Sequence, residues 1–131
     1  MEIVLSSAKR GYGLKELLSD NRDEFWSTDD SLPHSITISF LRKTYVHSLG
    51  FILSYALDES YTPENLIIHF NKQAIKQCFS EPEGEKTVLI DSFVFDIHIV
   101  IIGNHSDGKD SHVRGLNVKT SPTEEIRYNI K

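Results

Sequence analysis

Hydrophobic and polar residues alternate with a period of two along most of this chain. In a strand, successive side chains point to opposite faces, so such alternation predicts strands with one buried face. In the row Ile36, Ile38 and Phe40, for example, the intervening residues are polar. The pattern predicts six strands, at 35–40, 49–55, 66–70, 87–90, 93–101 and 116–120.

One short segment near the N-terminus has a different period. Leu14, Leu17 and Leu18 follow the i, i+3, i+4 spacing of a helix, which predicts one or two helical turns near 13–19. Turn-forming residues separate the strand runs, and no crossover helix lies between them. Parallel strands need such crossovers, so the pattern predicts an all-β antiparallel sandwich or barrel.

The run at 93–101 contains the longest apolar row. Val94, Val100 and Ile102 add apolar residues to its other face, which is typical of a strand buried on both sides at the centre of a sheet. The loop that follows it, 103–114, is rich in polar side chains. A loop held at the end of a central strand is a candidate for recognition.

Composition narrows the class of protein. A chain of 131 residues with 39% hydrophobic content suits one globular domain. A formal net charge of -5 argues against binding to nucleic acid through phosphates. The longest apolar run is too short to span a membrane, and no secretion signal is recognised at the N-terminus. Cys78 is the only cysteine, which excludes an intramolecular disulfide, and we expect it to be a buried structural thiol.

The polar loop at 103–114 allows several chemistries, and spacing argues against three of them. His105 and His112 are seven residues apart without cysteine partners, unlike zinc ligands. The acidic residues do not follow the ligand order of an EF-hand. Three residues of one short loop rarely form a Ser–His–Asp triad, and no other catalytic motif is present. A calcium site at the acidic turn 20–23 stays possible.

Trp26 lies in a block that resembles a known fold. An acidic and amide turn at 20–23, the pair Phe25–Trp26, and then Pro33 before a strand are similar to the galactose-binding-like jelly rolls. The resemblance implies that Trp26 packs beneath a loop at the mouth of the sandwich. A sugar-stacking platform is the alternative, but a single Trp that follows a Phe favours the core.

Three further blocks, at 6–13, 58–63 and 104–114, occur in the order found in DOC domains. Over about residues 4 to 121 the chain resembles the DOC-domain family, whose members include a subunit of the anaphase-promoting complex (cyclosome). The resemblance implies a non-catalytic subunit without cofactor or metal, in the nucleus and cytoplasm. It would act with a WD40 coactivator as a co-receptor for the destruction box, an Arg-x-x-Leu-type degron, and raise the processivity of ubiquitination.

The resemblance also implies a set of degron-binding residues in two loops. Within them, we expect Gly108 to supply a turn with positive φ, and Arg114 to bridge Asp110 or nearby carbonyls. Asp58 and Glu59 are expected to be solvated turn charges, with attraction of the degron arginine as the alternative. Family members often carry an amide where this chain has Asp107. The implied set is Ser60, Asn104, His105, Asp107, Gly108, Asp110, His112 and Arg114.

Asn104, Asp110 and Arg114 are expected mainly to shape the loop, since their side chains can bind backbone groups. For His105, Asp107 and His112, contact with the peptide is an equal alternative. The hydroxyl of Ser60 either donates to a peptide carbonyl or closes its own turn.

Residues 122–131 are expected to form an extended tail beyond a domain at 1–121. The resemblance implies that Tyr128, Ile130 and Lys131 dock on a tetratricopeptide-repeat subunit of the complex. Family tails commonly end in Ile-Arg, and a terminal Lys lacks the bidentate fork of Arg. Two other functions stay open: a carbohydrate-binding jelly roll, and a DOC domain of a different ubiquitin ligase.

Overall fold

Two long, bent strands organise the computed structural model of this chain, which describes residues 1–127. They are β3 (His34–Ser54) and β6 (Glu83–Asn104), and they pair with each other in antiparallel register along most of their length. The other strands are β1 (Glu2–Leu5), β2 (Trp26–Ser27), β4 (Pro63–Phe70), β5 (Gln73–Cys78), β7 (His112–Val113), β8 (Gly115–Lys119) and β9 (Glu125–Ile126). The helical turns are α1 (Leu14–Leu17), α2 (Tyr55–Asp58), η1 (Glu59–Tyr61) and η2 (His105–Asp107).

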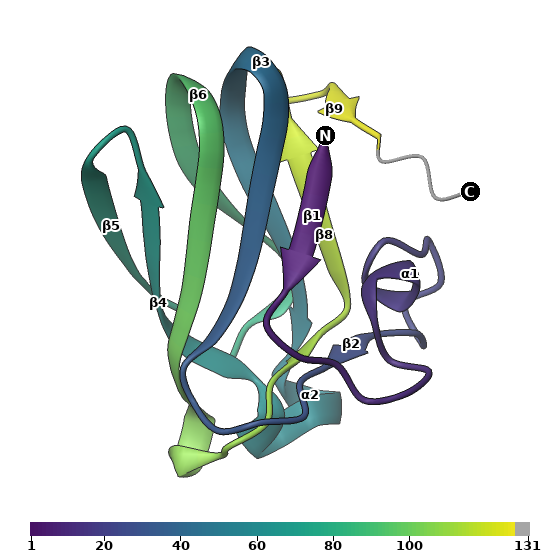
Figure 1. Cartoon of the computed structure of the whole chain (residues 1–131). Helices are drawn as coiled ribbons and strands as arrows, with labels where there is room; N and C mark the ends of the chain where they lie inside the picture. Colours follow the sequence, from purple (N-terminus) through teal and green to yellow (C-terminus); the bar gives the residue numbers. More distant parts are fainter. Residues whose placement is uncertain (128–131) are drawn as a thin grey trace.

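The strands β3 and β6 each contribute to both layers of a sandwich. The first part of β3 pairs with β1 and with the end of β6, whereas its second part pairs with β8 and with the start of β6. Register shifts between Ser39 and Thr44 and between Val46 and Ser48 accompany the bend between these parts. Figure 1 shows both strands curving over at the same end of the molecule. The sheet order is β5-β4-β6-β3-β8-β9, with β1 also on β3, and all pairs are antiparallel.

This arrangement confirms the predicted all-β antiparallel sandwich with a short N-terminal helix. The predicted strand 35–40 lies in the first half of β3, and 49–55 matches its second half except for Tyr55, which begins α2. The predicted strands 87–90 and 93–101 both lie within β6. The predicted central position is confirmed for 98–101, where β6 lies between β4 and β3. The predicted burial on both faces is wrong, because His98 and Ile102 are exposed. The predicted core position of Trp26 is confirmed too: the ring is fully buried, and its Nε1 donates to the carbonyl of Ser7 at 2.8 Å.

Two further predictions about buried residues are wrong. Phe93 and Phe95 are 58% and 57% exposed, whereas Val94 and Ile97 are buried. The inward row of β6 therefore changes phase between Val94 and Ile97, where β3 carries extra residues opposite β6. Cys78 is exposed at the end of β5, so it is not a buried structural thiol.

The hydrophobic core fills the space between the layers. It is built from the inward side chains of β3, β4, β6 and β8, with Leu17 of α1 and Trp26 of β2 packed against them. Burial of these apolar side chains is the main stabilising contribution to such a fold. Within residues 1–127 there is no helix with the length and apolar content needed to cross a membrane.

Candidate functional site

The predicted site residues lie at the end of the sandwich opposite the bends of β3 and β6. There α2, η1 and η2 lie close together, and the loop from Gly108 to Arg114 returns across the same end (Figure 1). We call this end the mouth. Residues from the two predicted loops, 58–63 and 104–114, therefore meet in space.

Asn104 fixes the shape of the second loop. Its side-chain nitrogen donates to the carbonyls of Gly108 at 2.9 Å and Asp110 at 3.1 Å, and its oxygen accepts from the Ser111 hydroxyl at 2.6 Å. Asn104 itself is buried. The expected role in binding loop backbone is present, and the loop is held from within by three hydrogen bonds.

Gly108 is needed for a different reason from the one expected. Its φ is -61°, so it supplies no left-handed turn; Ser106 and Asp107 occupy that region instead, with φ of 52° and 58°. A Cβ at position 108 would lie 1.8 Å from the carbonyl oxygen of Ser60. The glycine therefore allows the backbones of the two mouth loops to touch.

His105 holds two other segments together beneath the loop. It is 5% exposed, and its Nε2 accepts from the backbone N–H of Glu81 at 3.0 Å. Its Nδ1 lies 2.8 Å from the carbonyl oxygen of Thr62, which can only accept, so Nδ1 carries the proton. Both ring nitrogens are thus hydrogen-bonded inside the protein. Of the two expected roles for His105, this favours shaping the loop over contact with the peptide.

Asp58 is buried, contrary to the prediction that it is a solvated turn charge. Arg114 donates to both of its oxygens, from Nε at 2.9 Å and from Nη2 at 2.8 Å, and the Nδ1 of His112 lies 3.1 Å from one of them. Burial raises the pKa of Asp58, but the hydrogen bonds from His112 and Arg114 outweigh burial and lower the pKa below its ordinary value.

Arg114 was expected to bridge either Asp110 or nearby carbonyls, and the hydrogen bond to Asp110 is not formed. A bond to a nearby carbonyl is present, because Nη1 donates to the carbonyl of Arg22 at 2.7 Å. Hydrogen bonds to Asp58 raise the pKa of Arg114 more strongly than burial lowers it. Asp110 instead accepts from the Thr28 hydroxyl at 3.0 Å and lies 3.7 Å from the Lys9 ammonium.

The remaining predicted residues reach the surface of the mouth. Asp107 is exposed, whereas Ser60 and the side chain of His112 are partly exposed. These groups supply a hydroxyl, a carboxylate and an imidazole, a set able to bind the polar backbone of a peptide. Tyr128, Ile130 and Lys131 lie outside the described residues.

Sequence reasoning missed a group of aromatic residues beside this surface. Tyr12, Phe25 and Tyr61 gather around His112, although they belong to three separate blocks of the sequence. With Lys9 and Ser27 they line a pocket of about 260 Å³. Each aromatic residue stood in a block that resembled the family, but no spacing indicated that the rings would meet.

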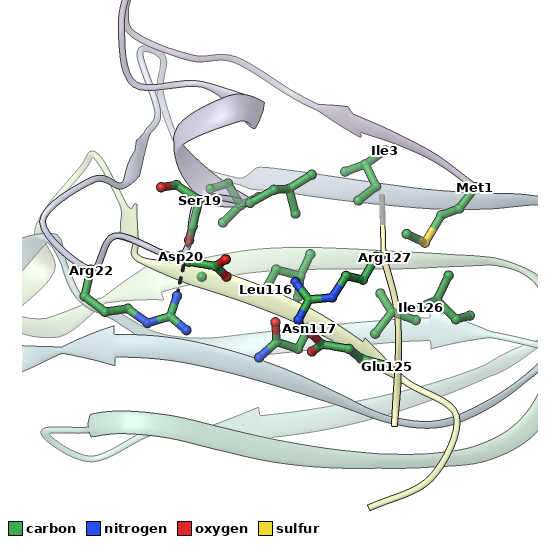
Figure 2. Close-up of a pocket in the computed structure, with 14 residues that line it drawn as sticks. Met1, Ile3, Ser19, Asp20, Arg22, Leu116, Asn117, Glu125, Ile126 and Arg127 are labelled. Carbon is green, nitrogen blue, oxygen red and sulfur yellow. Dashed lines mark hydrogen bonds and ion pairs between the residues drawn. The ribbon is translucent and has the colours of Figure 1, made fainter. Parts of the chain in front are cut away.

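A second hollow, of about 70 Å³, lies on the side of the sandwich between α1 and the strands β8 and β9. Figure 2 shows its mixed lining, with apolar side chains such as Ile3 and Leu116 and charged ones such as Asp20 and Arg127. It contains none of the predicted degron-binding residues. No group of three or more His, Cys, Asp or Glu residues able to hold a metal occurs in the described part of the chain.

The antiparallel sandwich has the fold of the galactose-binding-like jelly rolls. The family 32 carbohydrate-binding module of Clostridium perfringens NanJ, solved in complex with galactose, has a TM-score of 0.71 and 20% identity, covering 89% of this chain and 91% of that one. Another family 32 module of C. perfringens, in complex with GalNAc-β-1,3-galactose, has a TM-score of 0.70 at 14% identity, covering 89% of this chain and 93% of that one. At these identities the likeness shows the fold alone.

Sequence comparison defines the family within that class. The family model described as anaphase-promoting complex, subunit 10 (APC10) matches residues 1–131, and the chain belongs to this family. It is 38% identical over 133 residues to anaphase-promoting complex subunit 10 of Homo sapiens, covering 92% of this chain and 71% of the relative. The subunit 10 of Schizosaccharomyces pombe is 35% identical, with 92% and 70% covered.

The DOC1 subunit of Saccharomyces cerevisiae is more distant, at 26% identity, with 91% of this chain and 53% of the relative covered. All these names are names of a subunit of a multi-subunit complex, which agrees with the expectation of a chain that is not itself an enzyme.

Proposed function

We propose that this chain is a substrate-recognition subunit of the anaphase-promoting complex, which acts with a WD40 coactivator as a co-receptor for the destruction box. The observation that carries the proposal is the construction of the mouth. Asn104 and the contact of Gly108 with Ser60 fix two loops against each other, while Ser60, Asp107 and His112 remain accessible. A rigid polar surface of this kind binds a peptide without first being ordered.

The roles within the site divide by burial. Asn104, His105 and Arg114 are buried and hold the loops, and Asp110 anchors the second loop to Thr28. Ser60, Asp107 and His112 contact the degron, with the Ser60 hydroxyl as a donor to a peptide carbonyl and the Asp107 carboxylate as an acceptor of peptide N–H groups. The partly exposed backbone of Gly108 completes the surface.

Binding of the degron by two proteins at once accounts for the proposed rise in processivity. A degron held by the coactivator and by this chain at once rebinds one site while still bound to the other, so it dissociates from the complex more slowly. A substrate that stays longer receives more ubiquitin molecules in each encounter. The chain would contribute no reacting group to the ubiquitin transfer.

The tail proposal concerns residues 122–131, beyond a DOC domain at 1–121. Tyr128, Ile130 and Lys131 dock on a tetratricopeptide-repeat subunit, where Ile130 fills an apolar pocket and the terminal carboxylate is bound by donors. Figure 1 shows β9, which precedes these residues and pairs with β8, at the end of the sandwich opposite α2 and the mouth. The described part of this tail therefore lies at the end of the sandwich opposite the proposed degron site. Such a subunit would act in the nucleus and cytoplasm, without nucleic-acid or membrane partners.

Titration of a destruction-box peptide onto the chain with its WD40 coactivator tests the degron proposal. The variants Ser60→Ala and Asp107→Ala should each weaken the ternary complex about tenfold, as expected for the loss of one peptide hydrogen bond to a charged or well-placed group. The matched control is Asp96→Ala, an exposed acid on β6 outside the mouth. Unchanged ternary affinity in both mouth variants would overturn the site.

Two further experiments address the alternatives. A glycan array tests the carbohydrate-binding function, and strong sugar binding by this chain would contradict the degron proposal. For the tail, deletion of Ile130 and Lys131 should abolish capture of the tetratricopeptide-repeat subunit but leave the ternary degron complex intact. Undiminished capture would exclude docking through these residues.

A further inference from the structure

Four aromatic rings form a continuous row along one side of the mouth. Tyr12 and Phe25 have ring centroids 5.0 Å apart, Phe25 and His112 are 4.5 Å apart, and His112 and Tyr61 are stacked at 4.4 Å with an interplanar angle of 3°. The guanidinium of Arg114 lies 4.7 Å from the centroid of Phe25. The row therefore joins four segments of the chain, and it contacts the buried ion pair through Arg114.

This row is the wall of an open pocket. The pocket has a volume of about 260 Å³, and Lys9 and Ser27 complete its lining. Tyr12 and Tyr61 are 43% and 44% exposed, so the faces of their rings are open to the pocket. Exposed aromatic faces in a concave site favour a flat ligand group that can stack on them.

The hydrogen-bonding character of the pocket is set by His112. Asp58 has a lowered pKa and is therefore ionised, so it can only accept, and the Nδ1 of His112 must carry the proton that it shares with Asp58. In the neutral imidazole this leaves Nε2 as an acceptor. Nε2 has no hydrogen-bond partner among residues 1–127 and is not among the buried unpaired atoms. The Nε2 of neutral His112 is thus an acceptor whose position is fixed by the hydrogen bond to Asp58.

The charges around the pocket compensate each other. Lys9 is paired with Asp110 at 3.7 Å, and Arg114 is paired with Asp58 at 2.8 Å. A cationic ligand would meet Lys9 at the rim, and an anionic ligand would meet Asp110 beside it. Neither sign gains a net counter-charge, so the site favours an uncharged group.

We propose that this aromatic pocket binds one uncharged, flat side chain that carries an N–H donor, the carboxamide of Asn or Gln or the indole of Trp. The planar group stacks against the row of rings, and its N–H donates to the Nε2 of His112. The inference rests on the proposed function, in that the side chain belongs to the peptide bound at the mouth. It adds a specificity pocket, with Tyr12, Phe25 and Tyr61 as its walls, to the loop contacts described above.

The direct test uses short acetylated peptide amides, Gly-Gly-X-Gly-Gly, with X as Gln, Trp, Glu or Lys. Each is titrated onto the full chain, and the ring resonances of His112 and Tyr61 are followed by NMR. The Gln and Trp peptides should shift both resonances, whereas the Glu and Lys peptides should bind at least about tenfold more weakly, because they bring a charge into a compensated site. Equal binding by all four peptides, or binding by none, would overturn the proposal.

Two variants separate stacking from hydrogen bonding. His112→Phe keeps a ring in the row but removes the acceptor, so it should weaken the Gln peptide about fivefold. Tyr61→Ala removes an exposed wall without touching the ion pair and should weaken both the Gln and the Trp peptide about tenfold. The matched control is His98→Phe, an exposed histidine on the outer face of β6. If His112→Phe does not fold, Tyr61→Ala and Tyr12→Ala still decide the outcome.

Failure of this proposal is distinguishable from failure of the proposed function. The destruction-box peptide and the coactivator could bind Tyr61→Ala as tightly as the unaltered chain. That result would contradict the pocket proposal and leave the co-receptor proposal standing. Selective binding of the Gln and Trp peptides without any ternary degron complex would support the pocket proposal and contradict the co-receptor proposal.

Discussion

Asp58 and Arg114 form a bidentate ion pair beneath the mouth, although 56 residues separate them in the sequence. Asp58 ends α2, and Arg114 lies between β7 and β8, so the pair connects the first mouth loop to the end of the second. His112 binds the same carboxylate and stacks on Tyr61. The buried charge therefore positions a surface residue of the candidate site.

Asp58→Ala should lower the free energy of unfolding by about 3 kcal/mol, because it leaves the Arg114 guanidinium buried without its counter-charge. Urea unfolding followed by the fluorescence of the buried Trp26 measures this change. Asp96→Ala, an exposed acid on β6, serves as the control and should change the free energy by less than about 0.5 kcal/mol. A loss of less than about 1 kcal/mol in Asp58→Ala would show that the pair contributes little to stability.

The stability of the fold should fall in acid, and Asp58 should account for a defined part of the fall. Its pKa is lower in the folded chain than in the unfolded chain, so the unfolded state binds a proton first as the pH decreases. The contribution of the ion pair is present above about pH 4, the ordinary range of Asp, and is lost as the pH falls through the folded pKa. The difference in unfolding free energy between the unaltered chain and Asp58→Asn should therefore shrink from about pH 6 to about pH 3. A difference that stays constant over this range would contradict the lowered pKa.

Glu85 should add to the same acid sensitivity. The hydrogen bond from Lys119 lowers the pKa of Glu85 more strongly than burial raises it, and Asn117 also donates to this carboxylate. Because Glu85 is exposed, its share is screened by water and should be smaller than that of Asp58. Repeating the titration with Glu85→Gln separates the two carboxylates, and a larger effect than in Asp58→Asn would reverse this order.

The antiparallel sandwich could be predicted from the sequence because alternation of apolar and polar residues indicates which face of a strand is buried. The prediction of buried residues failed where burial does not follow a single period along the strand. Phe93 and Phe95 continued an apolar row, but the bend of β6 turned them outward, and β5 was missed because its residues are largely exposed. In the mouth, Asn104 could be assigned to loop backbone from its residue type, since that contact is local. The partners of Asp58 come from distant segments, and no local pattern identifies them.

Cys78 should react readily in the folded chain, because its side chain is exposed at the end of β5. A thiol reagent such as Ellman's reagent should label it without denaturant, at a rate near that of a free cysteine at the same pH. Cys78→Ser should abolish labelling and shift the unfolding free energy by less than about 0.5 kcal/mol. Labelling that requires urea would restore the original expectation of a buried thiol.

Gly108→Ala should separate the two mouth loops. The added Cβ would lie 1.8 Å from the carbonyl oxygen of Ser60 and 2.7 Å from its carbonyl carbon, and backbone atoms cannot rotate away as a flexible side chain can. We expect a loss of about 1–3 kcal/mol in unfolding free energy, as for other overpacked sites, together with weaker binding of the destruction-box peptide.

Gly103→Ala is the matched control for this variant, at a glycine five residues earlier in the same region. There the nearest atom to an added Cβ is the Asn65 side-chain nitrogen at 3.8 Å, an ordinary contact. This variant should retain both stability and peptide binding. If Gly108→Ala behaves like Gly103→Ala in both measurements, the loops are not held by their backbone contact, and the rigid surface on which degron recognition depends must have another origin.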